Sequence, residues 1–166
     1  MSGHDRTMSS YEIERKFLVH ELPENIDSFP SEEISQGYLA VTDGGIEVRL
    51  RKKGQAHFMS VKSGEGMRRE EIEIDLLEKQ FRALWPKTAG TRVEKKRIKI
   101  PYGSTVIELD IYSGSLEGLK TAEVEFKTQD DALAFTPPKW FDREITLDDR
   151  YKNKNLAMYG LPSKPS

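Results

Sequence analysis

The sequence contains no cysteine among its 166 residues. A disulfide framework and a thiolate zinc site are therefore both excluded, and any bound metal must take oxygen or imidazole ligands. A chain without disulfide chemistry is suited to a reducing compartment, so we expect a cytoplasmic protein.

Long apolar runs are also absent. No stretch approaches the roughly 20 apolar residues that a membrane-spanning helix needs, and the opening MSGHDRTMSS lacks the apolar segment of a secretory signal. We therefore expect a soluble protein with no membrane partner.

The chain has no excess of positive charge. Lys and Arg total 26 against 28 Asp and Glu, a formal charge of -2, which argues against a dedicated nucleic-acid binder. Histidine is scarce, and His4, His20 and His57 match no catalytic spacing. The two tryptophans, Trp85 and Trp140, are expected to be packing residues rather than platforms for stacked bases.

Short strands dominate the predicted secondary structure. A chain of 166 residues suits one domain, which we place at 10–160 between a disordered tail at 1–9 and a tail at 161–166. Period-two alternation predicts eight strands: 11–19, 33–41, 45–53, 56–63, 69–76, 91–100, 105–113 and 120–127. Helices are predicted at 76–84, 129–135 and 149–158.

Tight turns connect several of these strands. Glycines at 43–45, 53–55 and 64–66 are typical of hairpins, and short connections imply antiparallel pairing. We therefore expect a mainly β fold, either a sandwich or a barrel. About eight strands can close around one small ligand, which favours an eight-stranded antiparallel β-barrel with a few peripheral helices.

Charged residues alternate with apolar ones along the predicted strands. In the first strand Glu12, Glu14 and Lys16 share one face, while Ile13 and Phe17 share the other. The same alternation recurs at Arg49 and Arg51, Lys62, Glu71 and Glu73, Lys95 and Arg97, Glu108 and Asp110, and Glu123 and Glu125. The charges line either a solvated sheet face or the inside of a barrel, and alternation does not say which face is inside.

The acids on this face give a reason to consider a metal. Carboxylates confined together repel unless cations neutralise them. Glu12 and Glu14 lie about 7 Å apart along a strand, as do Glu123 and Glu125, and neighbouring strands are about 4.8 Å apart. Carboxylates from two such strands can converge on Mg²⁺ or Mn²⁺, hard cations that prefer oxygen and bridge to phosphates.

The first strand carries a family signature. The run from Glu12 to Val19 resembles the Glu-x-Glu-x-Lys opening of the CYTH superfamily, the triphosphate tunnel metalloenzymes. The later charged pairs follow in the order of that family, and the segment 149–157 resembles its closing stretch. The resemblance runs from about residue 11 to 158 and implies an eight-stranded antiparallel tunnel with a charged interior.

The resemblance also implies a role for each charged residue. It implies metal binding by Glu12, Glu14, Glu123 and Glu125, with Asp110 close by. It implies catalysis and binding of triphosphate oxygens by Lys16, Arg49, Arg51, Lys62, Lys95 and Arg97, since Arg and Lys suit phosphate.

Five residues are placed less firmly by the resemblance. Lys152 aligns with the family's lysine after Arg-Tyr, although Lys154 is an alternative substrate ligand. Glu71 and Glu73 serve either as partners of the arginines or as further metal ligands. Tyr38 resembles a tyrosine that can lie near the first-strand lysine, and a packing role is the alternative.

The expected activity is metal-dependent hydrolysis of a triphosphate, with inorganic triphosphate giving pyrophosphate and phosphate. The alternatives within the superfamily are an adenylate cyclase and a hydrolase of thiamine triphosphate or nucleotides. A non-catalytic polyphosphate- or nucleotide-binding module is the alternative of another class. Such a module would need the basic residues but not the acidic ones, so the presence of the acidic residues argues against it. The partner is then a small-molecule triphosphate, and the chain acts as a monomer or a homodimer.

Overall fold

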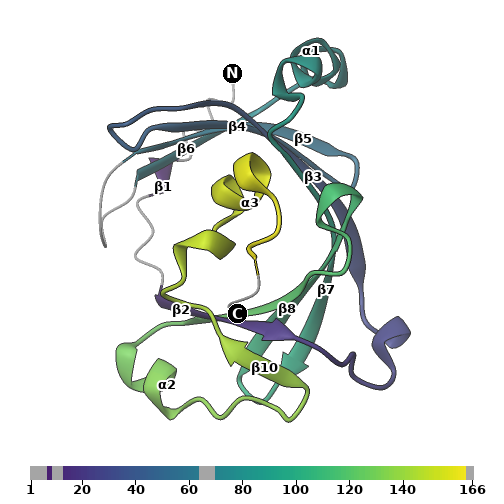
Figure 1. Ribbon diagram of the computed structural model, residues 1–166, viewed down its shortest axis with the longest axis vertical. Helices are drawn as coiled ribbons and strands as arrows, with labels where there is room; N and C mark the ends of the chain where they lie inside the picture. Colours follow the sequence, from purple (N-terminus) through teal and green to yellow (C-terminus); the bar gives the residue numbers. More distant parts are fainter. Residues whose placement is uncertain (1–6, 9–12, 64–69, 164–166) are drawn as a thin grey trace. The chain divides into compact units, whose positions relative to one another are not determined.

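A computed structural model describes residues 7–8, 13–63 and 70–163 (Figure 1). The predicted ligand Glu12, the predicted turn at 64–66, most of the tail predicted at 1–9 and residues 164–166 of the other predicted tail lie outside these residues. Within the tail predicted at 1–9, Thr7 and Met8 form a short strand.

The backbone contacts divide the chain into two compact units. Unit 1 comprises Met1–Tyr11 and Ser35–Arg92, and unit 2 comprises Glu12–Ile34 and Val93–Ser166. The single domain at 10–160 stays a prediction.

Unit 1 is an antiparallel sheet with strand order β1-β6-β5-β4-β3. Its strands are β1 (Thr7–Met8), β3 (Ser31–Val41, from Ser35 onward), β4 (Glu47–Lys53), β5 (Ala56–Ser63) and β6 (Glu70–Asp75). Of the three hairpin turns predicted within this unit, the two that lie among the described residues contain Gly45 at φ 87° and Gly54 at φ 58°, backbone conformations that favour glycine.

A helix packs on unit 1. Helix α1 (Glu78–Leu84) runs into the 3-10 helix η2 (Trp85–Thr88) and lies beside β5 (Figure 1). Its buried Phe81 contacts His57 of β5 and stacks on Trp85, with ring centroids 5.0 and 5.1 Å apart. Trp85 is therefore a packing residue, as predicted.

Unit 2 is also an antiparallel sheet, with strand order β3-β7-β8-β9-β2-β10. Its strands are β2 (Ile13–Val19), the start of β3, β7 (Arg92–Tyr102, from Val93 onward), β8 (Thr105–Ser113), β9 (Lys120–Phe126) and β10 (Phe141–Glu144). Its helices are η1 (Ile26–Ser28), η3 (Gly114–Leu116), α2 (Gln129–Ala134), η4 (Asp149–Tyr151) and α3 (Asn153–Tyr159). None of the helices among the described residues has the length and apolarity needed to cross a bilayer.

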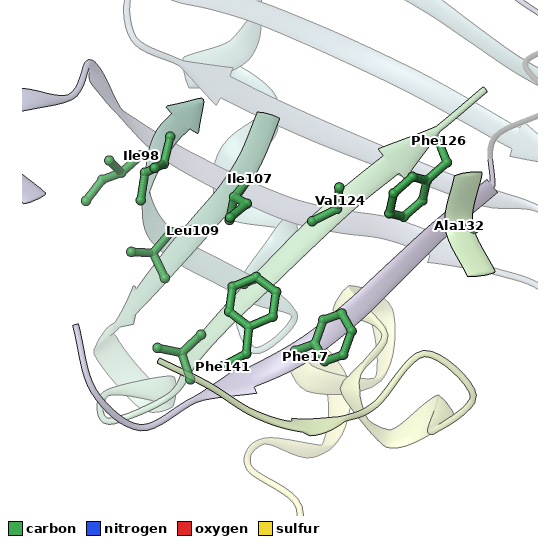
Figure 2. Close-up of a cluster of buried hydrophobic side chains, with 11 residues drawn as sticks. Phe17, Ile98, Ile107, Leu109, Val124, Phe126, Ala132 and Phe141 are labelled. Atoms are coloured by element: carbon green, nitrogen blue, oxygen red, sulfur yellow. The ribbon is translucent and has the colours of Figure 1, made fainter. Parts of the chain in front are cut away.

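The core of unit 2 lies on one face of its sheet (Figure 2). Phe17 of β2, Leu109 of β8 and Val124 of β9 are buried there in one cluster with Phe141 of β10 and Ala132 of α2. Each strand alternates, so the charged residues between these positions point to the opposite face. In unit 2 the apolar core is thus on one side of the sheet and the charged cluster on the other.

The predicted mainly β fold with a few helices is confirmed. All eight predicted strands and all three predicted helical segments are present, and β1 and β10 are additional. Strand β10 was missed because only four residues pair there, with a shift of register against β2. Among the described residues neither unit closes into a barrel by itself, and the closed eight-stranded tunnel stays a prediction.

Candidate functional site

Unit 1 carries a basic cluster on the face shared by β4, β5 and β6. Lys62 is the register partner of both Glu47 and Glu71, which aligns charges across three strands. Arg49 Nη2 donates to Glu71 Oε1 over 2.9 Å, and Lys62 Nζ lies 3.9 Å from Glu71 Oε2. The structure therefore brings the predicted residues Arg49, Lys62 and Glu71 together. Glu73 lies on the same face, as the register partner of Ser60.

Arg49 has an unsatisfied donor. The residue is 6% exposed, and its Nε has no hydrogen-bond partner among the described residues. Because a buried N–H without an acceptor costs free energy, such a group calls for an explanation. An anion supplied by a ligand would satisfy it, and a guanidinium fits a phosphate oxygen well.

A buried amide fixes the next arginine. Gln36 Oε1 accepts from both Nε and Nη2 of Arg51, over 3.1 and 3.0 Å, and Gln36 Nε2 donates to the Tyr38 hydroxyl over 2.8 Å. Gln36 and Tyr38 are both buried. Sequence patterning did not single out Gln36, because a neutral amide among many charges carries no visible signal of its role.

The basic character of unit 1 is visible in its pKa shifts. Burial lowers the pKa of Lys62, and the nearby positive charge of Arg49 lowers it further. Burial acts to raise the pKa of Glu71, but Lys62 and Arg49 outweigh it and hold that pKa below its usual range. Burial raises the pKa of Tyr38, which keeps its hydroxyl protonated. The cluster therefore holds positive charge close together at partial burial, an arrangement that a polyanion would stabilise.

Unit 2 carries a carboxylate triad, which we define as Glu14, Glu123 and Glu125. Each residue offers an oxygen, and the three oxygens lie within 4.8 Å of one another. The register explains the convergence, since Glu14 is opposite Glu125 and Lys16 is opposite Glu123 on the paired strands β2 and β9. The structure thus brings three of the four predicted metal ligands together, and the fourth, Glu12, lies outside the described residues.

The ionisation of Glu123 reflects this setting. Burial acts to raise its pKa, yet a hydrogen bond shared with Glu14 and the positive charge of Lys16 hold the pKa below the ordinary value. Glu123 therefore keeps its negative charge at neutral pH.

A buried ion cluster lies on the same face. Asp110 accepts from Lys95 Nζ over 2.8 Å and from Arg97 Nε and Nη2 over 2.8 and 2.9 Å. Burial alone would raise the pKa of Asp110, but the two cations lower it to about 2. For Lys95, the effect of burial outweighs the attraction of the Asp110 charge, and the pKa of Lys95 is lowered to about 8. The Lys95 side chain is 1% exposed. Its ammonium is therefore shielded from solvent, and Asp110 is the acid that holds it.

The C-terminal segment meets the first strand. Lys16 Nζ donates to the backbone oxygen of Tyr151 over 2.8 Å. Lys152 Nζ lies 3.2 Å from Asp149 Oδ1, with 41% of its side chain exposed, and Lys154 is partly exposed. Lys16 is thus on the charged face beside the triad, whereas Lys152 pairs within its own segment.

Two further residues join the unit 2 cluster without a role assigned from sequence. Glu108 Oε2 lies 2.8 Å from Arg97 Nη1. Tyr112 is buried beneath the ammonium of Lys95, which lies 5.4 Å from the ring centroid. Glu108 shares the alternation of Asp110, which could have identified it, while Tyr112 reads as an ordinary core aromatic.

The triad fits a hard divalent cation. Carboxylate oxygens are the ligands that Mg²⁺ prefers, at about 2.1 Å, so two ligands of one ion lie at most about 4.2 Å apart. Oxygens within 4.8 Å reach that geometry by a small contraction. The charge also fits, since the acids Glu14, Glu108, Asp110, Glu123 and Glu125, when all are ionised, exceed the nearby cations Lys16, Lys95 and Arg97 by two.

These features define a class of protein. They are those of a protein that binds a cation and a polyanion. The charged face of unit 2 carries the carboxylate triad, which suits a cation. The charged face of unit 1 carries the basic cluster with the unsatisfied guanidinium, which suits a polyanion.

The chain belongs to the CYTH domain family, whose model matches residues 10–145. The family resemblance of the charged motifs is thereby confirmed. The chain is 48% identical over 150 residues to an inorganic triphosphatase of Nitrosomonas europaea, covering 89% of this chain and 97% of that protein. It is 32% identical over 152 residues to an inorganic triphosphatase of Acetivibrio thermocellus, covering 88% and 92%.

A solved structure agrees with this assignment. The crystal structure of an inorganic triphosphatase matches with a TM-score of 0.75 at 44% identity, over 96% of this chain and 99% of that one. A putative adenylyl cyclase from Hippeastrum, at 14% identity and a TM-score of 0.53, covers 74% of this chain and shares the fold alone.

Proposed function

We propose that this chain is a metal-dependent triphosphatase that hydrolyses inorganic triphosphate to pyrophosphate and phosphate. The observation that carries the proposal is the carboxylate triad set in register with a lysine, where oxygens within 4.8 Å of one another adjoin Lys16. The two relatives named as inorganic triphosphatases, each matched over about nine-tenths of this chain, support the same substrate.

The cations bind the phosphate oxygens. Arg49 offers its unsatisfied Nε, and Gln36 holds Arg51 in a fixed orientation. Lys62, Lys16 and Arg97 add positive charge, which stabilises the charge that develops as the bond to the terminal phosphorus breaks. Lys152 and Lys154 are further candidates for a phosphate contact. Lys95 contributes indirectly, because Asp110 holds its ammonium in a buried position.

Mg²⁺ or Mn²⁺ would be held by Glu14, Glu123 and Glu125, with Glu12 as the fourth ligand. Such an ion would supply Lewis-acid chemistry, neutralising charge on the phosphate and lowering the pKa of a water. Glu71 acts as the partner that fixes Arg49 and Lys62 rather than as a ligand, since both cations contact its carboxylate. The chain needs no covalent nucleophile for this reaction. A reducing cytoplasm suits a protein without cysteine.

Replacing Glu125 by Gln tests the proposal. The change keeps the shape of the side chain and removes one negative charge from the triad. We expect hydrolysis of inorganic triphosphate to fall by orders of magnitude, while metal-free binding of triphosphate, measured by calorimetry, is retained because the basic residues are untouched. The matched control is Glu117→Gln, an exposed loop position outside the cluster, which should be silent.

Product analysis separates the alternatives. The wild type is given inorganic triphosphate, ATP and thiamine triphosphate, each with Mg²⁺ or Mn²⁺, and the released phosphate and pyrophosphate are measured. Near wild-type activity of Glu125→Gln at limiting Mg²⁺ would remove Glu125 from the metal site. Formation of cyclic AMP from ATP without phosphate release would refute the hydrolase.

A further inference from the structure

Glu108 lies between the carboxylate triad and the buried ion cluster of Lys95, Arg97 and Asp110 in unit 2. Its register partner across β8 and β9 is Glu123, a member of the carboxylate triad. Its carboxylate nevertheless pairs with Arg97, because Oε2 lies 2.8 Å from Nη1. The side chain is 22% exposed, whereas that of Asp110 is 2% exposed.

The guanidinium of Arg97 is held on two edges. Nε and Nη2 donate to Asp110, and Nη1 faces Glu108. Asp110 also neutralises Lys95, so its single charge is divided between two cations. Asp110 alone therefore leaves this cluster with one positive charge in excess, and Glu108 supplies the matching negative charge.

An unscreened guanidinium here would oppose cation binding. Arg97 lies beside the triad, because its ion-pair partner Glu108 is the register partner of Glu123 across β8 and β9, so the field of its positive charge reaches Glu123. The same field would repel a divalent ion twice as strongly as a monovalent one, since the Coulomb energy scales with charge. A carboxylate paired with Arg97 on the side of Glu123 cancels that field where the ion would bind.

We propose that Glu108 is a positioning residue that screens Arg97 from the carboxylate triad and thereby sets the affinity of the triad for a divalent cation. This inference rests on the proposed function of the triad as the metal site. Glu108 acts through Arg97 and does not bind the ion.

Mn²⁺ binding in the absence of substrate provides the test, with free Mn²⁺ followed by electron paramagnetic resonance. Glu108→Gln should bind Mn²⁺ about tenfold more weakly than the wild type, because one positive charge is no longer cancelled. Arg97→Met should bind more tightly. The double variant, in which both charges of the pair are removed, should return to within about threefold of the wild type.

Glu108→Asp is the second variant, and it needs no change at Arg97. It keeps the charge but shortens the side chain, so a screening role predicts affinity near that of the wild type, whereas a direct ligand would be withdrawn from the ion. Glu117→Gln is the matched control for loss of one negative charge elsewhere in unit 2. Unfolding midpoints establish that each variant is folded.

The outcomes distinguish the inference from the function on which it rests. If Glu108→Gln and the double variant bind Mn²⁺ equally weakly, Glu108 is a ligand and the screening role is refuted. The same conclusion follows if Glu108→Asp binds Mn²⁺ as weakly as Glu108→Gln. An unchanged affinity in Glu108→Gln refutes it as well. Absence of saturable Mn²⁺ binding in the wild type would overturn the metal site itself, and the role of Glu108 with it.

Discussion

Asp110→Asn removes the negative charge that two cations share in unit 2. Asp110 and the Lys95 side chain are 2% and 1% exposed, so the substitution leaves a buried ammonium without its counter-charge. Breaking a buried ion pair on one side costs about 3–5 kcal/mol. We expect the free energy of unfolding to fall by that amount at neutral pH, and Tm to fall by about 10 °C.

The pH dependence gives an independent measure of the same interaction. The pKa of Asp110 is about 2 against an ordinary value of 3.8, which corresponds to roughly 2.5 kcal/mol of stability. Because the folded-state pKa is the lower one, this stability is present above about pH 4 and is lost as the pH falls toward 2. The difference between wild type and Asp110→Asn should therefore shrink over that range.

Urea denaturation followed by circular dichroism at several pH values measures both effects. Lys95→Met combined with Asp110→Asn removes the stranded charge and should recover part of the loss. Asp130→Asn, at an exposed position in α2, is the matched control. A loss below about 1 kcal/mol for Asp110→Asn, independent of pH, would refute the buried pair as the source of stability.

Three further predictions concern other parts of the molecule. Gly37→Ala should destabilise the protein by about 1–3 kcal/mol, because an added Cβ would lie 2.5 Å from Thr88 Oγ1; a silent change in a thermal melt would contradict that close approach. Arg51→Ala should raise KM for triphosphate and leave the fold intact, since the guanidinium held by Gln36 is lost, and unchanged kinetics would remove Arg51 from the site. Ca²⁺ should support little turnover compared with Mg²⁺, because its longer and looser coordination misplaces the reacting groups; equal rates in a phosphate-release assay would show that metal geometry does not matter.

The strands could be predicted from the sequence because alternation is a local property. Leu109 and Val124 form part of one core, and each lies between two acidic residues that share the opposite face whatever the tertiary structure. Turn chemistry added the boundaries, since Gly45 and Gly54 adopt conformations that other residues avoid. Strand β10 gave no such signal, because its four residues pair irregularly with β2.

Partner choice within the charged face could not be predicted in the same way. Alternation places Lys95, Arg97, Glu108 and Asp110 on one face but does not say which acid pairs with which base. That depends on register and on burial, which make Asp110 the shared partner and leave Glu108 to the outer edge of Arg97. The sequence therefore predicted a set of charged residues. The structure distinguishes those with a donor available for a ligand from those that form ion pairs with one another.

Burial explains why the two kinds of cation differ. Lys95 is fully enclosed, and its positive charge is tolerated only because Asp110 and the Tyr112 ring lie against it. Arg49 is almost as buried, yet its Nε lacks an acceptor among the described residues. A buried cation whose donors are all satisfied stabilises the fold, whereas a donor without an acceptor, such as Arg49 Nε, gains its partner only when an anion arrives. By this criterion Arg49 is the cation in the described chain whose substitution should weaken triphosphate binding most for the least loss of stability.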